Sequence, residues 1–571
     1  MKNEFSLKRW FPILSWGPDY TKPKFAEDTI AALIVAIMLI PQALAYALLA
    51  GLPAEMGLYA SIIGLSIYTI FGTSNSLSVA PVAVISLMTA AALARLSLPN
   101  LEEMVAAALT LTFLSGVFLL LLGMFRLGFM ANFLSRPVIN AFVTASALII
   151  GLSQMQHMLG VSAEGQNFVD LISSLVGEIL NTNLVTFALG LGSISLIIFG
   201  KKFIHKSLLK LGLDEQMAAI CSRASPLLVA LTTGALAYLF RLDQLGVQLL
   251  GNVNRGMPEF SVPNLSWDLL SSLVGSALLI SIIGFVESIS VAQTLAARKR
   301  EKVDANQELL GLGAANLATS FGGGFPISGG FSRSVVNFEA GAATPAAGFF
   351  TAILIAIVVL LFAPVLFWLP RVALAAIIIV AIYGLLDFSI LRKAWNYSKA
   401  DFAALFITLA STLAIGVEVG IGLGVLASIF IHLYKTSQPH VAVIGRVRGT
   451  EHFRNINRHA VETFENQLSI RIDESLYFAN TRYLEELIFT LVTDKPSLEH
   501  VILMCTAVNK IDMSALETLE KINETLMELG MKLHLSEVKD PIMGSLAQTD
   551  FFKNLSGNNY LSQNQAVEDL R

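Results

Sequence analysis

The chain begins its apolar part with an uninterrupted run, Thr29 to Ala54, that contains no Asp, Glu, Lys or Arg. A transmembrane helix needs about 20 mostly apolar residues. Comparable runs follow along most of the 571 residues, so that 54% of the sequence is hydrophobic, 14% is charged and the mean hydropathy is +0.67. These values lie outside the range of soluble globular proteins. The sequence therefore predicts an α-helical polytopic membrane protein. The first run starts too late and is too long for a secretory signal peptide.

Fourteen apolar segments occur, most of them long enough to cross a bilayer and the shorter ones long enough to cross it in part. They lie near residues 28–48, 56–72, 79–94, 104–123, 133–155, 181–200, 222–240, 268–296, 306–322, 331–340, 344–364, 370–386, 401–416 and 418–435. An even number of spans puts both ends of the membrane part on the same side.

The distribution of basic residues predicts which side that is, because Lys and Arg accumulate in short cytoplasmic loops. If the N-terminus is inside, the outer loops hold little beyond Arg95, Arg241 and Arg255. The inner loops then hold Arg126, Arg136, Lys201, Lys202, Lys206, Lys210, Arg223, Arg298, Lys299, Arg300, Lys302, Arg392, Lys393 and Lys399. We expect a multi-pass protein of the inner (plasma) membrane with cytoplasmic N- and C-termini.

Charged residues become frequent beyond Tyr434, which is typical of a water-soluble segment. Strand-like segments alternate there with helix-like segments, as in "HVILMCTAV" followed by "MSALETLEKINETLMEL". Such alternation predicts a small α/β domain. We expect three parts: an N-terminal cytoplasmic segment (1–26), a transmembrane domain (27–435) and a cytoplasmic domain (436–571).

Several chemistries find no support in the sequence. The chain has two cysteines, Cys221 and Cys505, so cysteines alone cannot build a disulfide or metal framework. No G-x-x-x-x-G-K-[ST] phosphate loop and no catalytic triad pattern occurs. The net charge of -4 is small for this length and points to no particular partner. We expect no enzymatic activity, no cofactor and no nucleic-acid partner.

Two apolar segments are broken at matching places in the two halves of the chain. The third span reads "GTSNSLSVAPVAVIS" and the tenth, which is the third of the second half, lies in "FGGGFPISGGFSRSVVNF". Interrupted segments in corresponding positions are the best sequence indication of a transporter binding site. Extended chain at membrane depth is tolerated only where it is buried in protein or lines a cavity. We expect a short helix to start near Pro81, since proline suits a first turn, and another near Ser332.

Half-helices that start inside the membrane direct free N-H groups and a positive dipole end at whatever lies ahead of them. Together with Ser332 and Arg333, two such starts face to face would form an anion site. The alternatives are that Pro81 only kinks a structural helix, that the glycines of the tenth span only help packing, and that Arg333 reaches an aqueous vestibule.

Glu287 is an acid within an otherwise apolar span, "IIGFVESISVAQ". Such residues are rare and usually functional, often as ion or proton sites. We expect Glu287 to couple transport to a cation. The alternative is a structural ion-pair partner, in particular for Arg333. Asn306 and Glu308 follow the basic inner loop, and we expect them to be structural residues that cap and orient the next span.

The motifs around these sites resemble those of the sulfate permease (SulP) family, which also includes animal anion exchangers, and the tail resembles a STAS domain. The motifs are "PQALAYALLAGLPAEMGLYAS", "GTSNSLSVAPVAVIS", "FLSRPVINAFVTASALI", "ESISVAQTLAARKREKVDANQELLGLGAANL" and "GGFSRSVVNFEAGAATPAAG". The resemblance implies two inverted seven-span repeats. It further implies a core (spans 1–4 and 8–11), a gate (the other spans), elevator-like movement and a homodimer.

The resemblance also implies site residues, carried over by motif. Substrate would lie between the third and tenth spans and be approached by the first and eighth. The substrate-binding residues would be Gln42, Tyr46, Ala80, Pro81, Val82, Phe331, Ser332 and Arg333. In the tail, regulatory STAS proteins carry a phosphorylatable serine directly after an aspartate. Here Met513 follows Asp512, and Ser514 comes next, so we expect the tail to serve assembly and folding.

The function we expect is secondary active uptake of an inorganic oxyanion, sulfate before bicarbonate, coupled to H+ or Na+. A fixed arginine suits a multivalent anion. A bicarbonate/Na+ or dicarboxylate symporter, an anion exchanger or channel, and a receptor that signals through its tail remain open alternatives.

Overall fold

The structure is a computed structural model that describes residues 7–571 apart from 97, 134, 164, 166, 213–214, 216–217, 219–221, 223–224, 252–255 and 494. Cys221, Arg223 and Arg255, which figure in the sequence analysis, lie outside the described residues. The chain forms two compact units, Met1–Ser428 and Ile429–Arg571, and each is described by itself.

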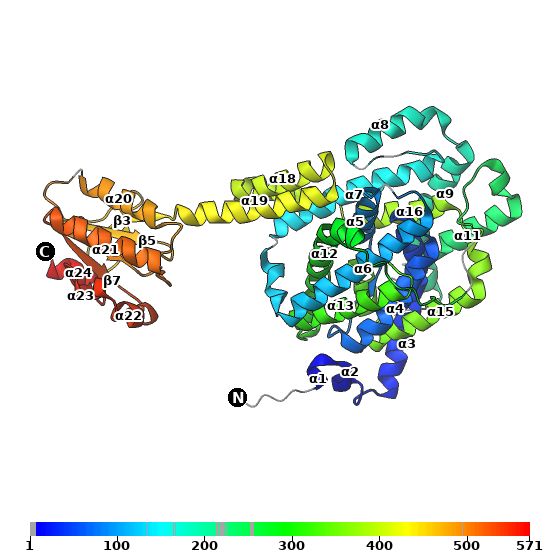
Figure 1. Ribbon diagram of the computed structural model, residues 1–571, viewed down its shortest axis with the longest axis horizontal. Coiled ribbons are helices and arrows are strands. Elements are labelled where there is room, and N and C mark those ends of the chain that lie inside the picture. The colour runs from blue at the N-terminus through cyan, green and yellow to red at the C-terminus, as the bar shows by residue number, and fades with distance from the viewer. Residues whose placement is uncertain are drawn as a thin grey trace. The chain divides into compact units, whose positions relative to one another are not determined.

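Each of the fourteen expected spans corresponds to a helix (Figure 1). They are α3 (Lys22–Leu49), α4 (Ala54–Phe71), α5 (Ala83–Ala94), α6 (Leu101–Met124), α7 (Arg136–Leu159), α9 (Leu184–Lys210), α11 (Ser225–Phe240), α12 (Trp267–Lys299), α13 (Ala305–Phe321), α14 (Phe331–Glu339), α15 (Ala346–Leu366), α16 (Arg371–Tyr383), α18 (Lys399–Ala414) and α19 (Val417–Ser437). Among the described residues, eight helices are long and apolar enough to cross a membrane by length and composition, and α5, α11 and α16 are shorter apolar helices.

Short elements outside the expected spans complete this unit. They are α1 (Leu7–Trp10), α2 (Ile13–Trp16), the 3-10 turns Leu127–Phe133, Ile179–Asn181 and Leu242–Leu245, α8 (Phe168–Glu178) and α17 (Ser389–Tyr397). In α8 only Leu171 and Leu175 are buried. A helix with so narrow a buried face lies on the surface of the bundle.

Glycines allow a close helix contact between α6 and α13. A Cβ atom at Gly116 would lie 2.6 Å from the backbone nitrogen of Leu317, and one at Gly313 would lie 2.8 Å from that of Leu120. Small residues let helix backbones approach in this way, which suits membrane bundles because apolar burial alone does not favour one helix neighbour over lipid.

The two broken segments meet in a two-residue antiparallel ladder. Strand β1 (Val79–Ala80) pairs with β2 (Ser328–Gly329), with Val79 opposite Gly329 and Ala80 opposite Ser328. Helix α5 begins at Ala83 with Val82 as its N-cap, and α14 begins at Phe331 with Gly330 as its N-cap. Both helices thus begin near the predicted places, but Pro81 precedes the N-cap of α5 and does not lie in its first turn. Pro81 directly follows the paired residue Ala80, and it has no N-H with which to extend the ladder.

The second unit is an α/β domain built on a sheet of order β4-β3-β5-β6-β7-β8. Its strands are β3 (Val441–Arg446), β4 (Phe453–Asn455), β5 (Gln467–Ile472), β6 (His500–Met504), β7 (Lys532–Ser536) and β8 (Asn559–Tyr560). The four strands from β5 to β8 pair in parallel, whereas β3 is antiparallel to both of its neighbours. The alternation of strands and helices that the sequence predicts is confirmed, with β4 and β8 as additions.

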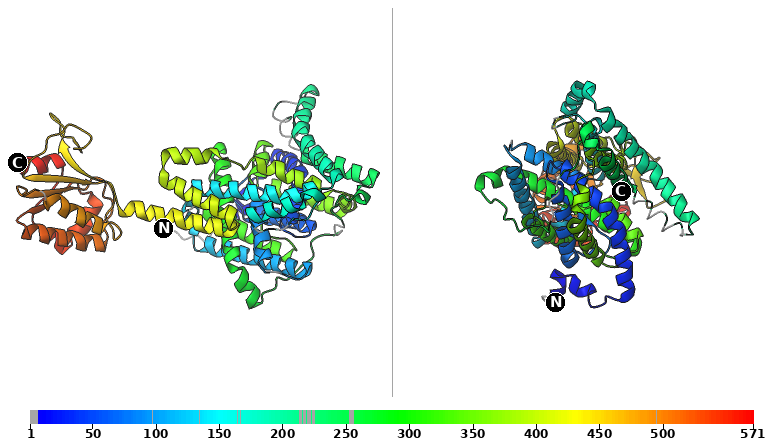
Figure 2. Two further views of the ribbon diagram at one scale, coloured as in Figure 1. Left: turned by 90° about the horizontal axis from the view of Figure 1, so that it is seen from above. Right: turned by 90° about the vertical axis from the view of Figure 1, so that its right-hand side faces the viewer.

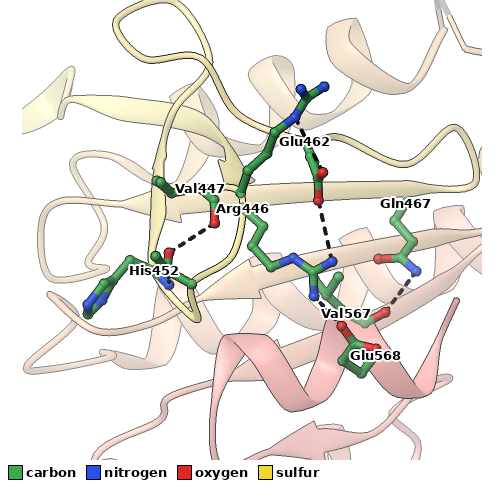
Figure 3. Close-up of polar contacts among 9 residues, drawn as sticks. Arg446, Val447, His452, Glu462, Gln467, Val567 and Glu568 are labelled. Carbon is green, nitrogen blue, oxygen red and sulfur yellow. Dashed lines mark hydrogen bonds and ion pairs between the residues drawn. The ribbon is translucent and has the colours of Figure 1, made fainter.

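Helices cover both faces of this sheet (Figure 2). The larger core packs α20 (Thr481–Thr493), α21 (Met513–Glu528) and α22 (Asp540–Leu546) on one face, with α23 (Asp550–Lys553) beside them. The smaller core packs α24 (Gln563–Asp569) on the other face, through Ala566 and Val567. Arg446 of β3 links the sheet to α24, because its guanidinium contacts Glu568 of that helix as well as Glu462 (Figure 3).

The turn before α21 is held by Asp512, which accepts hydrogen bonds from the backbone N-H of Ala515 (2.9 Å) and of Phe478 (2.9 Å). Asp512 is thus an N-cap that also fixes the neighbouring loop. Met513 and Ser514 are exposed beside it.

Candidate functional site

A cavity of about 330 Å³ lies where the two broken helices meet α3, α12 and α16. Seven of the nine residues predicted for the site line it, namely Gln42, Tyr46, Val82, Glu287, Phe331, Ser332 and Arg333. These residues are spread over almost 300 positions of sequence, and the fold brings them together.

Ala80 and Pro81 do not line the cavity, but they lie next to residues that do. Both are buried, and the carbonyl oxygen of Ala80 accepts a hydrogen bond from Nη2 of Arg333 at 3.3 Å. Their contribution is to place Arg333 and to lead the chain into α5. Phe331 and Ser332, in contrast, are exposed at the start of α14.

Arg333 is the buried cation of the cavity, with 3% of its surface exposed. Besides its contact with Ala80, its Nη1 lies 3.5 Å from Oε1 of Gln42, at the limit of a hydrogen bond, and its Nε has no partner. A guanidinium offers five N-H donors in a planar fork. Two long contacts leave most of this capacity free for an anion that enters the cavity.

Backbone groups add to this positive field. The first N-H groups of α14, from Phe331 onward, have no acceptor within the helix. The start of α5 at Ala83 lies on the same cavity. Helix N-termini attract anions through free N-H groups and the helix dipole. The cavity therefore combines one fixed charge with two helix starts.

Glu287 of α12 is the acid of the cavity. Its Oε2 is buried without a hydrogen-bond partner, and within the described residues no ion pair of 4 Å or less joins it to Arg333. The alternative of a direct structural ion pair between these two residues is thus not what the structure shows. An acid and a base instead share one cavity without neutralising each other by contact.

Side-chain hydrogen bonds hold the broken segments in place. Ser288 accepts from the backbone N-H of Gly329 (2.8 Å), Ser334 accepts from that of Ser78 (2.9 Å), and Asn337 donates to the carbonyl of Ser76 (3.2 Å). Extended backbone at this depth needs such partners, because no water is available in the bilayer core.

Of the prediction for Asn306 and Glu308, the capping part is wrong, because Asp304 is the N-cap of α13 and accepts from the N-H groups of Asn306 and Gln307. The orienting role fits Glu308. Glu308 is fully buried and accepts hydrogen bonds from Tyr68 (2.6 Å) and from the backbone N-H of Thr73 (2.8 Å). It fastens the end of α4 to α13, away from the cavity.

Sequence reasoning missed the wall that α16 contributes. Ala381, Ile382, Gly384 and Leu385 close the cavity opposite the broken helices. Prolines, glycine clusters and charges indicate the other residues of the site, whereas this segment offers only the single Gly384 among apolar neighbours. Only the fold reveals that this apolar segment faces Arg333.

Family models match both parts of the chain. The sulfate permease family model matches residues 25–408 and the STAS domain model matches residues 458–566. The chain is 33% identical over 552 residues to sulfate transporter 4.1, chloroplastic, of Arabidopsis thaliana, a match that covers 94% of this chain and 79% of the relative. It is 30% identical to the probable sulfate transporter MT1781 of Mycobacterium tuberculosis, with 94% and 93% covered.

Solved structures agree on the fold. Murine Slc26a9, described as an anion transporter in the inward-facing state, has a TM-score of 0.91 at 22% identity, with 100% of this chain and 96% of that chain covered. The transmembrane domain of the cyanobacterial bicarbonate transporter BicA has a TM-score of 0.60 at 20% identity, with 72% and 98% covered. At such identities the likeness shows the fold alone. With its permease model, its STAS tail and relatives above 30% identity along nearly its whole length, this chain belongs to the sulfate permease family of membrane transporters.

Proposed function

We propose that this protein is a secondary active transporter that takes up sulfate, coupled to H+ or Na+, and that the cavity around Arg333 is its substrate site. The observation that carries the proposal is Arg333 itself, a buried guanidinium with unused donors at the start of α14.

Physical chemistry favours an oxyanion at this position. A buried arginine is costly unless an anion or several acceptors compensate it, and its contacts to Gln42 and Ala80 are long and neutral. Hydrogen bonds between an arginine and an oxyanion are charge-assisted and bidentate, and therefore about twice as strong as neutral ones. A doubly charged tetrahedral anion uses more of these donors than a chloride ion can.

The relatives support sulfate before other anions. The plant and mycobacterial relatives that match nearly the whole chain are named sulfate transporters. Bicarbonate and dicarboxylates are alternative substrates, because their oxygens also accept hydrogen bonds from a guanidinium. An anion exchanger or a channel would use the same cavity without a coupling ion.

For coupling we propose Glu287. A dianion beside Arg333 leaves one negative charge uncompensated, and Glu287 lines the same cavity. A proton on Glu287, or a Na+ ion bound to it, removes the repulsion between its carboxylate and the substrate. The loaded core would then move past the gate in an elevator-like step. We further propose a homodimer with cytoplasmic termini.

The test is uptake by proteoliposomes that contain the full-length protein. The panel uses labelled sulfate, bicarbonate, chloride and dicarboxylates, with pH and Na+ gradients varied separately. We expect sulfate accumulation that depends on one of the gradients. Accumulation of another anion in its place would change the substrate, and conductance without gradient-driven accumulation would favour a channel.

Arg333 provides the first prediction. Arg333→Ala removes the fixed charge and should weaken sulfate binding at least about 10-fold, since a charged hydrogen bond contributes about 1.5–3 kcal/mol. Arg333→Lys keeps the charge without the planar fork and should bind at an intermediate level. Binding is measured by isothermal titration with sulfate on folded, monodisperse protein. Normal binding and accumulation by Arg333→Ala would rule out the direct role in the anion site.

A further inference from the structure

A second cavity, of about 500 Å³, lies between α3, α11 and the end of α15. Its lining includes Pro41 and Leu44 of α3, Gly234 and Tyr238 of α11, and Pro364 and Trp368 at and beyond the end of α15. Apart from the hydroxyl of Tyr238 and the indole N-H of Trp368, the side chains of this lining are apolar.

A cavity with so apolar a lining favours an apolar occupant over water. Protein interiors are close-packed, and voids larger than a water molecule are few. A buried water needs two to four polar partners, which this lining hardly offers. The cavity opens on the surface, because its lining residues Leu231 and Val365 are 56% and 57% exposed, and the neighbouring Leu239 is 70% exposed. Such a surface on spanning helices faces acyl chains, so a chain from the bilayer can enter the cavity.

A cation stands beside this cavity. Arg241 follows the last residue of α11, and its guanidinium carbon lies 5.2 Å from the centre of the Trp368 ring. Tyr238 meets the same ring edge-on, with centroids 5.1 Å apart. Arg241 is exposed and forms no ion pair with any residue that the structure describes. Arginine recognises phosphate through its planar fork of donors.

From this arrangement we propose that the α3–α11–α15 cavity is a binding site for an anionic phospholipid, whose acyl chain fills the cavity and whose phosphate is bound by Arg241. The inference does not depend on which anion is transported. It has a consequence for transport, because Gln42 and Tyr46 line the anion cavity from the same helix whose Pro41 and Leu44 line the lipid cavity. A bound lipid thus packs against the helix that carries substrate-site residues.

The test uses Trp368 as a reporter, because it lines the cavity. The other four tryptophans are replaced by phenylalanine in the full-length protein. The protein is reconstituted in phosphatidylcholine vesicles that contain increasing fractions of phosphatidylglycerol with brominated acyl chains, which quench tryptophan fluorescence on contact. A parallel series uses brominated phosphatidylcholine. We expect quenching by the brominated phosphatidylglycerol to saturate at low mole fraction.

The half-saturating fraction should be about five-fold lower for phosphatidylglycerol than for phosphatidylcholine, because a basic residue at the membrane surface contributes about 1 kcal/mol to binding of an anionic lipid. Arg241→Gln should remove this preference. Gly234→Leu should fill the cavity, since a Cβ there meets only the backbone oxygen of Trp368, at 3.9 Å, and quenching should then rise in proportion to the bulk fraction.

Gly192→Leu is the matched control, because a Cβ at Gly192 in α9 meets nothing within 4 Å. It should behave like the parent. Quenching of the parent that rises linearly and equally with both lipids would overturn the proposal, as would an unchanged preference in Arg241→Gln. Because Arg241 is exposed, this variant decides the question even where Gly234→Leu fails to fold.

Discussion

Arg333 and Glu287 lie on the same cavity without forming a direct ion pair in the described structure. Charged pairs in membranes usually neutralise each other. Keeping them apart leaves the guanidinium available to an anion and the carboxylate available to a cation. The coupling proposed above requires such an arrangement, because each residue would then respond to the occupant of the cavity.

Glu287→Gln tests this arrangement, because glutamine resembles a permanently protonated acid. We expect the variant to bind sulfate and to exchange labelled for unlabelled sulfate across vesicles. It should lose accumulation driven by an imposed pH or Na+ gradient, since no proton or Na+ can be taken up at position 287. Both activities are measured in the same proteoliposome preparation.

Glu308→Gln is the control for a buried acid that lies outside the cavity. Its carboxylate is held by Tyr68 and Thr73, so the variant should lower stability without changing the dependence on the gradient. If Glu287→Gln accumulates sulfate as well as the parent, with the same cation dependence, coupling resides elsewhere and Glu287 is structural.

A residue of the C-terminal unit predicts a pH dependence of stability. Burial, together with the neighbouring His500 and Lys532, lowers the pKa of His534 to about 4. Its Nδ1 accepts a hydrogen bond from the backbone N-H of Asn558 (3.0 Å), and its Nε2 lies 3.1 Å from Nδ1 of His500. A proton on Nδ1 would break the first contact, so the folded domain holds His534 neutral.

The sign follows from the unfolded chain, in which a histidine has a pKa of about 6.5. Between these two values the unfolded state binds more protons than the folded one. The contribution of His534 to the free energy of unfolding is therefore fully present above about pH 6.5 and decreases as the pH drops towards 4. By pH 5 the loss should reach about 2 kcal/mol.

Hydrogen exchange of β6 and β7 in the full-length protein, corrected for intrinsic rates, measures this loss as about 30-fold lower protection at pH 5 than at pH 7.5. His534→Gln cannot titrate and should lack most of the difference. An equal loss in the variant would assign the pH dependence to another group.

At the scale of elements, an ion pair joins α5 to α19. Arg95 follows α5 and contacts Glu418 in the first turn of α19. The arginine side chain is 48% exposed, whereas that of Glu418 is 3% exposed and its Oε1 has no partner. In the family's division of spans, α5 belongs to the core and α19 to the gate, so this contact would cross between the two bodies.

Because Arg95 and Glu418 differ in burial, their single variants should differ in the free energy of unfolding that they lose. Arg95→Gln leaves a buried carboxylate without its partner and should lower the free energy of unfolding by about 2 kcal/mol. Glu418→Gln leaves an arginine that water can solvate and should cost less than about 1 kcal/mol. Thermal unfolding in detergent measures both, and the double variant should resemble Glu418→Gln. Equal losses would contradict the assignment of the burial penalty to Glu418.

The elements also show what the sequence could and could not predict. Long apolar runs such as Thr29 to Ala54 determine helices because a bilayer allows a spanning segment few alternatives, and all fourteen were predicted. The ladder of β1 and β2 was not, since two residues per strand are too short for any alternating pattern. Helix α8 was missed because its apolar face is narrow and its length is below that of a span.

The sequence predicts the polar and charged residues of the candidate site, but it does not predict the apolar residues that enclose the cavity. Pro81, Ser332, Arg333 and Glu287 stand out because proline and polar or charged side chains are expensive inside a membrane and need a reason. Nothing in the sequence distinguishes the cavity-lining residues around Ile382, because apolar residues are expected throughout an apolar helix. Which apolar face meets the charged one depends on how all the helices pack.

At the scale of the whole molecule, every residue that lines the anion cavity lies in the unit Met1–Ser428. A stop codon after Ser437 keeps α19 complete and removes the sheet domain. We expect the truncated protein to show a lower yield or weaker dimer and an altered rate, by about two- to ten-fold, while the rank order of transported anions stays the same, because selectivity depends on the cavity.

Uptake competition with the same anion panel measures this rank order for the full-length and truncated proteins side by side. A changed order would mean that the C-terminal domain shapes the cavity. An unchanged rate and yield would mean that it serves neither assembly nor control of transport under these conditions.

The ladder between β1 and β2 also bears on how the protein is made. Val79 and Ala80 acquire their backbone partners only when Ser328 and Gly329 have been synthesised and inserted. Until then the first broken helix carries extended backbone into the membrane without its final hydrogen bonds, and each unsatisfied group there costs several kcal/mol. The nascent chain must therefore shelter this segment through some 250 further residues of translation. The proposed anion site therefore forms late, and a chain that terminates before Ser328 contains only the first of its two broken helices.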